Sequence, residues 1–205
     1  MAHASRQGLQ SFVDDYTLSK TIMGGDALFR VTSQAEFSIT DSSGIEFNFK
    51  EGRWRVRNLL EIARLIQVSL DVDEAFVQSF LFYVFYLSRR RLSSILWVPT
   101  DLNQAEAFLL SKNQLTTTPF SLTNERHTQT LIRLLSSDGV AIFSTDGTLL
   151  SFGSVVDTSK VEISGMKGTG ESVAAILGRN GVAVKVSQDG TIKLFLRNAP
   201  APMTI

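Results

Sequence analysis

The sequence contains no cysteine and only two histidines, and both shortages exclude kinds of chemistry. Without cysteine the chain has no disulfide framework and no thiolate nucleophile, which is compatible with a cytoplasmic location. His3 lies near the start of the chain and His127 in a polar segment. The sequence therefore offers too few histidines for a histidine-based zinc site or a serine-histidine triad. Zinc enzymes and triad hydrolases are therefore not predicted.

The chain also has no excess of charge of either sign and no long apolar run. Its 20 basic and 20 acidic residues leave a net charge of zero, so no overall field attracts nucleic acid or an anionic membrane. The strongly apolar stretch at residues 75–87 is shorter than the roughly 20 residues that a membrane span needs. Residues 1–7 lack the apolar core of a signal peptide. We expect a cytoplasmic protein without a membrane span and without a nucleic-acid partner.

What the sequence does contain is enough apolar material for a folded core. Hydrophobic residues make up 43% of the chain and charged residues 20%, which is typical of a globular protein and not of a disordered one. A length of 205 residues corresponds to one to one and a half domains.

Hydrophobic and polar residues alternate over residues 28–57. A period of two predicts a small antiparallel β-meander with one wet face and one buried face. Arg53, Arg55 and Arg57 fall on one face of its last strand. They could contact a phosphate or a partner's carboxylates, but a solvated strand face is the preferred interpretation. We take residues 1–57 as an N-terminal β-meander region.

From residue 58 the hydrophobic period lengthens to that of helices. The spacing predicts one helix from Leu59 and a second through Leu87, with Asp71 or Asp73 as the N-cap of the second. Further along we expect a strand at 95–98, a short helix at 103–111, a loop at 115–120 and a helix at 124–135. Strands are expected at 140–143 and 148–156, a strand or loop at 161–163, and a helix after residue 170. A hairpin across Asp189 and Gly190 follows, and Pro200 and Pro202 mark a frayed end or linker. This order predicts an α/β fold for residues 58–205, with a central mixed β-sheet flanked by helices. These residues either form a domain separate from the meander or make one continuous domain with it.

A glycine-rich turn at residues 165–170 leads directly into a helix-forming segment. Its glycines let backbone N–H groups surround a phosphate, Thr169 and Ser172 add hydroxyl donors, and the helix contributes the positive end of its dipole. The pattern favours an anion-binding cradle, although a plain connection between two elements has the same composition. Neither a Walker A loop nor a dinucleotide-binding fingerprint matches it.

Three further segments place this turn in a context. Residues 134–143 lead from a helix end into a buried strand, residues 182–192 form a strand, a turn and a strand, and residues 87–98 form a basic helix end followed by an apolar strand. This order resembles the nucleotide-binding domain of the diadenylate cyclases, the family that includes the DNA integrity scanning protein and joins two ATP molecules into cyclic di-AMP. The resemblance spans residues 74–197.

The motifs of that family are only partly present. The family's Asp-Gly-Ala stands here as Asp138-Gly139-Val140, and its Ser-Glu-Glu as Ser187-Gln188-Asp189. Its Gly-Thr-Arg-His-Arg stands as Gly168-Thr169-Gly170-Glu171-Ser172, so the groups expected to hold the ATP triphosphate are missing and a carboxylate stands among them. The segment between positions 175 and 187 is also a few residues shorter than the family pattern. The resemblance therefore implies a noncatalytic, sensor-like relative.

The resemblance also implies the residues of the site. The nucleotide-binding residues would be Asp138, Gly139, Gly168, Thr169, Gly170, Ser172 and Ser187. Asp138 would be the catalytic residue if the domain is active, and it would bind a Mg²⁺ or Mn²⁺ ion that accompanies the nucleotide. A tight turn explains the Asp-Gly pairs at positions 146 and 189, and this alternative stays open for Asp138. Glu171 and Asp189 are interpreted as solvated carboxylates.

Three functions follow from these residues. The leading one is a module that binds or senses a nucleotide or cyclic dinucleotide without forming the phosphodiester bond. The second is an active diadenylate cyclase that uses Lys167, Lys185 or a partner's arginines in place of the missing groups. The third is a structural or assembly domain whose pocket binds nothing. We expect a homo-oligomer or a fused effector domain as the further partner, and no cofactor beyond the metal ion.

Overall fold

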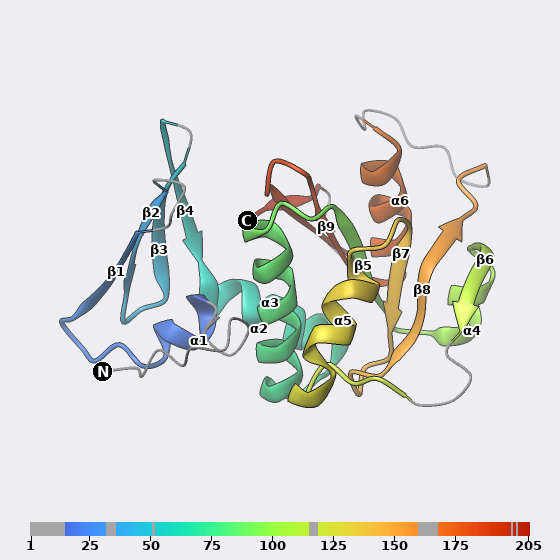
Figure 1. Cartoon of the computed structure of the whole chain (residues 1–205), viewed down its shortest axis with the longest axis horizontal. Coiled ribbons are helices and arrows are strands. Elements are labelled where there is room, and N and C mark those ends of the chain that lie inside the picture. The colour runs from blue at the N-terminus through green and yellow to red at the C-terminus, as the bar shows by residue number, and fades with distance from the viewer. Residues whose placement is uncertain are drawn as a thin grey trace. The chain divides into compact units, whose positions relative to one another are not determined.

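The computed structural model describes residues 15–31, 36–50, 52–114, 119–159, 168–197, 199 and 201–205 (Figure 1). The chain divides into two compact units, Met1–Leu65 and Ile66–Ile205. The division falls inside helix α2 (Leu59–Leu70), which therefore belongs partly to each unit. Whether residues 1–57 form a domain of their own stays a prediction.

The first unit contains a four-stranded antiparallel sheet, as the alternating pattern predicts (Figure 1). In the order of the sheet, its strands are β1 (Ala27–Val31), β2 (Phe37–Asp41), β3 (Ile45–Lys50) and β4 (Arg53–Asn58). A short helix, α1 (Asp15–Ser19), contacts β2. The turn after β2 is held by Asp41 Oδ1, which accepts hydrogen bonds from the N–H groups of Ser43 and Ile45, each at 3.0 Å. Hydrogen bonds from the Ser43 hydroxyl and the Ile45 N–H lower the pKa of the Asp41 carboxyl.

The face of this sheet that was expected to be solvated is buried, and the face that was expected to be buried is exposed. Its polar face is the covered one, where Glu46 has no exposed surface, whereas Phe29 is 61% exposed and Trp54 53% exposed on the apolar face. Arg57 lies on the covered face, with its Nε 3.3 Å from Glu46 Oε2. The interpretation of a solvated arginine face is therefore wrong for Arg57, because a buried carboxylate needs a cation beside it.

Both helices predicted after the meander are present. Helix α2 follows β4 directly, and α3 (Glu74–Arg89) begins at its N-cap Asp73, whose Oδ1 accepts a hydrogen bond of 2.8 Å from the Phe76 N–H. The side chains of α3 are buried along most of its length, including Phe80 and Tyr83, which confirms a core helix. No helix among the described residues is long and apolar enough to cross a membrane.

The second unit contains a seven-stranded mixed sheet flanked by helices, which confirms the α/β class. The sheet order is β11-β10-β9-β5-β7-β8-β6, and β5 and β7 pair in parallel while the other neighbours pair antiparallel. Its strands are β5 (Ser94–Pro99), β6 (Leu109–Gln114), β7 (Val140–Phe143), β8 (Leu149–Val156), β9 (Gly181–Val186), β10 (Ile192–Leu196) and β11 (Met203–Thr204). Its further helical elements are α4 (Leu102–Glu106), the 3-10 turn η1 (Glu125–His127), α5 (Thr128–Leu135) and α6 (Thr169–Gly178).

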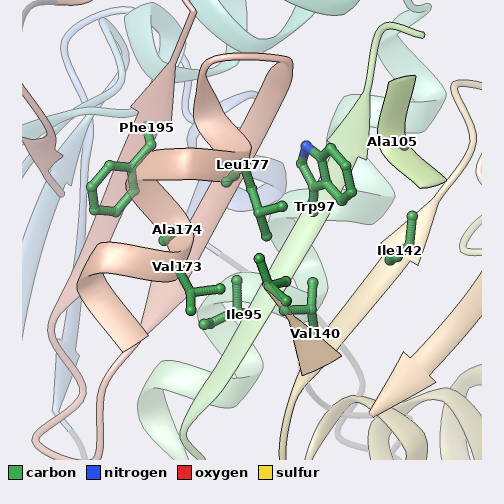
Figure 2. Packing of buried hydrophobic residues seen from close by; sticks show 11 residues of the cluster. Ile95, Trp97, Ala105, Val140, Ile142, Val173, Ala174, Leu177 and Phe195 are labelled. Carbon is green, nitrogen blue, oxygen red and sulfur yellow. The ribbon is translucent and has the colours of Figure 1, made fainter. Parts of the chain in front are cut away.

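Side chains that alternate along β9 separate the two faces of this sheet. Ala183 packs in a buried cluster with Val173, Ala174 and Leu177 of α6, as Figure 2 shows for the helix residues beside β5. The intervening residue Val184 points to the opposite face, and α3 contacts β9. The cluster also includes Trp97, which has no exposed surface, and it fixes α6 along β5, β9 and β10.

Two elements differ from the sequence-based expectation. The helix expected at 103–111 ends at Glu106, and residues 109–114 form strand β6, because pairing with β8 satisfies their backbone groups. The expected frayed end contains β11, which pairs with β10, and Ile205 is buried. The expected elements at 115–118 and 161–163 lie outside the described residues.

Candidate functional site

The first turn of α6 carries most of the predicted cradle. Gly168 is its N-cap, with a φ of +95° that glycine adopts without strain, and no heavy atom lies within 4 Å of where its Cβ would be. Thr169 is exposed, and the Ser172 hydroxyl donates a hydrogen bond of 3.3 Å to the Gly168 carbonyl. The N-cap residue makes no side-chain hydrogen bond to the N–H groups at the start of this ten-residue helix, and the first turn of a helix leaves such groups without a partner inside the helix. Residues 165–167, including Lys167, lie outside the described part of the chain.

Lys185 of β9 reaches beneath this turn. A Cβ atom on Gly170 would lie 2.8 Å from Lys185 Cε, so the glycine makes room for the lysine side chain. Lys185 Nζ donates hydrogen bonds to Ser93 Oγ at 2.8 Å and to the Val186 carbonyl at 3.0 Å. These two bonds fix the ammonium near the C-terminal end of β9 and use two of its three N–H donors.

Two carboxylates act on the same ammonium. Burial lowers the pKa of Lys185 from its usual 10.5, and the negative charges of Asp138 and Asp189 oppose that shift. Asp138 comes from the turn before β7 and Asp189 from the hairpin between β9 and β10, so chain segments about fifty residues apart converge on one lysine. The cluster of Lys185, Asp138 and Asp189 beside the α6 first turn is called the Lys185 site below.

The remaining acceptors and donors of this site follow from local turns. Asp138 is exposed, and its Oδ1 accepts a hydrogen bond of 3.0 Å from the Gly139 N–H. Ser187 closes the β9–β10 hairpin through its backbone, and Asp189 accepts from the N–H and the hydroxyl of Thr191 at 2.8 and 3.0 Å. Because Ser187 is two residues after Lys185, its side chain is expected on the same side of the strand.

Gly139 has a packing reason to be glycine. It has a φ of +101°, and a Cβ there would lie 2.6 Å from the carbonyl carbon of Gly153 in β8. The predicted nucleotide-binding role of Gly139 was tied to its motif, whereas the structure accounts for the residue by the close approach of β8. We therefore expect Gly139→Ala to destabilise the fold by about 2 kcal/mol or more, because strain and overpacking add.

The measurement for Gly139→Ala is the midpoint of urea unfolding, with Gly24→Ala as control because its Cβ would meet no atom within 4 Å. The control should shift the midpoint little. An unchanged midpoint in Gly139→Ala together with weaker ligand binding would show that Gly139 acts on the ligand.

Glu171 is not the solvated carboxylate that the sequence suggested. Its Oε1 lies 2.7 Å from Lys193 Nζ of β10, and both side chains are mostly covered. The ion pair forms because α6 packs on β10 and brings the helix start over that strand. The charge of Glu171 is thereby compensated within the protein.

The described residues do not form a cage for a metal ion. Among them there is no group of three or more histidine, cysteine, aspartate or glutamate side chains that could hold one. Asp138 is a single carboxylate, whereas Mg²⁺ and Mn²⁺ take several oxygen ligands. Metal binding at Asp138 thus stays a prediction that needs phosphate oxygens from the ligand.

From the sequence alone, Lys185 is expected only as a substitute for the missing cations of an active enzyme. Its central place comes from the pairing of β9 with β5, which no local pattern in the sequence reveals. One signal was available: in Gly-Val-Ala-Val-Lys-Val, residues 181–186, a single lysine interrupts an otherwise apolar strand. A charge in a buried strand points to a specific partner or ligand.

Comparisons with known proteins give the fold a context. No protein-family profile and no curated protein matches the sequence. Among solved structures, the chain is similar to a hypothetical membrane spanning protein from Bacillus cereus, with a TM-score of 0.52 and 19% identity over 72% of this chain and 74% of that one. It is also similar to DacA from Staphylococcus aureus, with a TM-score of 0.46 and 17% identity over 64% of this chain and 86% of that one. The first likeness shows a shared fold, and the second is more distant and partial.

Proposed function

We propose that the second unit binds a nucleotide or cyclic dinucleotide at the Lys185 site and does not join two nucleotides. The observation that supports this most is the half-buried Lys185 ammonium, held by Ser93 and Val186 under the first turn of α6. An ammonium taken partly out of water costs stability unless a counter-charge approaches it. A phosphate between Lys185 and the α6 N–H groups would supply that charge and accept hydrogen bonds from both.

The relation between Gly170 and Lys185 supports the same proposal. Under the resemblance to the diadenylate cyclases, Gly170 stands where the family has the first arginine of its Arg-His-Arg motif. Because Lys185 Cε lies 2.8 Å from the place of a Cβ at position 170, a side chain there would displace the end of the Lys185 side chain from its present position. The sheet thus supplies one cation at a place where the family's helix supplies arginine and histidine side chains.

The charges favour a ligand with little charge on each phosphate. The negative charges of Asp138 and Asp189 act on Lys185, so the formal charges of these three groups sum to one negative charge, and Lys193 compensates Glu171. Repulsion between a carboxylate and a further phosphate charge is worth about 1 to 4 kcal/mol at partial burial. A cyclic dinucleotide carries one charge per phosphate and avoids most of that cost. A free nucleoside triphosphate does not.

A thermal-shift panel tests this proposal. The probes are AMP, ADP, ATP, cyclic di-AMP and cyclic di-GMP, each with and without Mg²⁺ or Mn²⁺. A probe at a hundred times its dissociation constant should stabilise the chain by about 2.7 kcal/mol, and the shift should disappear in Thr169→Val combined with Ser172→Ala. If no probe shifts the melting temperature, or if the shift survives the double substitution, a structural or assembly domain becomes the better account.

Replacing Glu171 by Gln should tighten ATP binding in the absence of metal while changing cyclic di-AMP binding little. The substitution releases Lys193 from its partner and leaves a net positive charge near the helix start. Because both side chains are partly exposed, the gain should be about two- to fivefold. Titrations in EDTA measure it, with Glu125→Gln, an exposed position, as the control for net charge. Loss of a metal-dependent nucleotide affinity in Glu171→Gln would instead show that Glu171 is a metal ligand.

A further inference from the structure

The apolar face of the sheet in the first unit is an exposed aromatic surface. By the strand register, the side chains of Phe29, Phe37, Phe49 and Trp54 share one face with Phe47 and Val56. Ring centroids lie 4.8 Å apart for Phe37 and Phe49, 5.2 Å for Phe37 and Trp54, and 5.3 Å for Phe49 and Trp54. Phe29, Val31, Phe47, Trp54 and Val56 are all exposed. This surface is called the aromatic face.

The lysine and arginine side chains of the same sheet lie on the other face. Arg57 pairs there with Glu46, and Lys50 Nζ lies 3.5 Å from Glu36 Oε1. Along the described strands, the aromatic face carries no lysine or arginine, and its one acidic residue, Asp41, is bound to the turn after β2. Nucleic acid and anionic lipid are recognised through cations beside the aromatic rings, and the aromatic face offers none. Its charge and composition fit a neutral, apolar protein surface.

A second copy of the chain provides such a surface. Two sheets with apolar faces pack about 10 Å apart, with their strands nearly aligned, as in a β-sandwich. A two-fold axis would bring the aromatic face of one copy onto the same residues of the other, so an apolar surface would meet an equally apolar surface. The chain has zero net charge, so two copies do not repel one another at long range.

The size of the face sets the strength of this contact. Four strands about 4.8 Å apart and about 20 Å long give a footprint on the order of 400 Å². Patches of about 300 to 600 Å² are often functional, but a standard stable interface buries about 800 Å² on each partner. We propose that the aromatic face mediates a weak, reversible homodimer, with a dissociation constant on the order of 10 to 100 µM.

Sedimentation of the full chain from about 1 to 500 µM, a range chosen to bracket that constant, tests the proposal. The informative variant is Phe47→Lys with Val56→Lys, two exposed residues that lie directly opposite on β3 and β4. Lysines from both copies would then face one another in the contact, and this like-charge repulsion should weaken the dimer at least about tenfold. The matched control is Leu110→Lys with Val155→Lys, exposed apolar residues on two paired strands of the other sheet. Circular dichroism and the melting temperature establish that each variant is folded.

Concentration-dependent dimers in the wild type and the control, and monomers in Phe47→Lys with Val56→Lys, are the expected result. A wild type that stays monomeric at the highest concentration overturns the proposal. So does a dimer that persists in the Phe47→Lys and Val56→Lys variant, because another surface would then carry it. A monomer that floats with phosphatidylcholine vesicles would overturn it in favour of a membrane surface. None of these outcomes depends on nucleotide binding by the second unit.

Discussion

Incubation of the chain with ATP and Mn²⁺ is expected to yield no cyclic di-AMP above the uncatalysed background. Joining two ATP molecules brings two polyanions together and develops further charge on the reacting phosphate. Where the cyclase family has arginine, histidine and arginine, this chain has Gly170, Glu171 and Ser172. Lys185 replaces at most one of those groups, and the negative charges of Asp138 and Asp189 already act on it.

The expected loss is large because these groups act on the transition state. Removing a single preorganised donor commonly lowers the rate about a hundredfold or more. Mass spectrometry of the product at catalytic protein concentrations makes the measurement. Cyclic di-AMP that accumulates over many turnovers, and vanishes on Asp138→Asn, would contradict the prediction and establish a working cyclase that uses Lys185.

Lys185→Met is expected to weaken ligand binding strongly and leave the fold at least as stable as before. A charge-assisted hydrogen bond to a phosphate contributes about 1.5 to 3 kcal/mol, so affinity for the probe that stabilises the wild type should fall about ten- to a hundredfold. Methionine fits a similar volume without a buried charge, and such replacements are often neutral or stabilising. Asp138 and Asp189 are exposed and remain solvated without their cation.

The dependence of stability on pH follows from the direction of the pKa shift. The pKa of Lys185 is lower in the folded protein than the usual 10.5, so in that interval the unfolded chain binds more protons. The destabilising effect of the ammonium is present below the folded-state pKa, and stability rises as the pH increases from the folded-state value towards 10.5. Lys185→Met should remove this rise.

Urea unfolding between pH 8 and pH 10.5, together with probe titrations at pH 7, measures both effects for Lys185→Met. Arg179→Met is the matched control, because it removes one positive charge from an exposed position at the other end of α6. If Lys185→Met loses stability along with binding, Lys185 is a structural cation that holds Ser93 and β9 together. The proposal that Lys185 binds the ligand would then be contradicted.

Much of the fold was accessible from the sequence because local patterns determine it. The alternation in residues 28–57 predicts the meander, Asp73 marks the start of α3, and the Asp189-Gly190 pair marks the β9–β10 hairpin. Strand β6 was missed because residues 109–114 have no clear period of two, and their state depends on pairing with β8. The orientation of the meander was also missed, because alternation defines two faces without showing which one is covered.

The candidate site was only partly predictable for a related reason. The turn before α6 and Asp138 are visible as motifs, since glycine, serine and aspartate in turns have local signatures. The ion pair of Glu171 with Lys193 and the position of Lys185 beneath Gly170 depend on how α6 packs on β9 and β10. Such contacts join residues far apart in the sequence and leave no spacing to detect.

The pKa of the Lys185 ammonium, with and without a bound probe, tests the central claim most directly. Nuclear magnetic resonance of isotope-labelled lysine side chains gives this value, and the signal that disappears in Lys185→Arg identifies the residue. We predict a pKa below 10.5 in the free protein and a rise when a cyclic dinucleotide or nucleotide of the panel saturates it, because a phosphate favours the charged form. An identical pKa with and without every probe of the panel would contradict an anion site at Lys185.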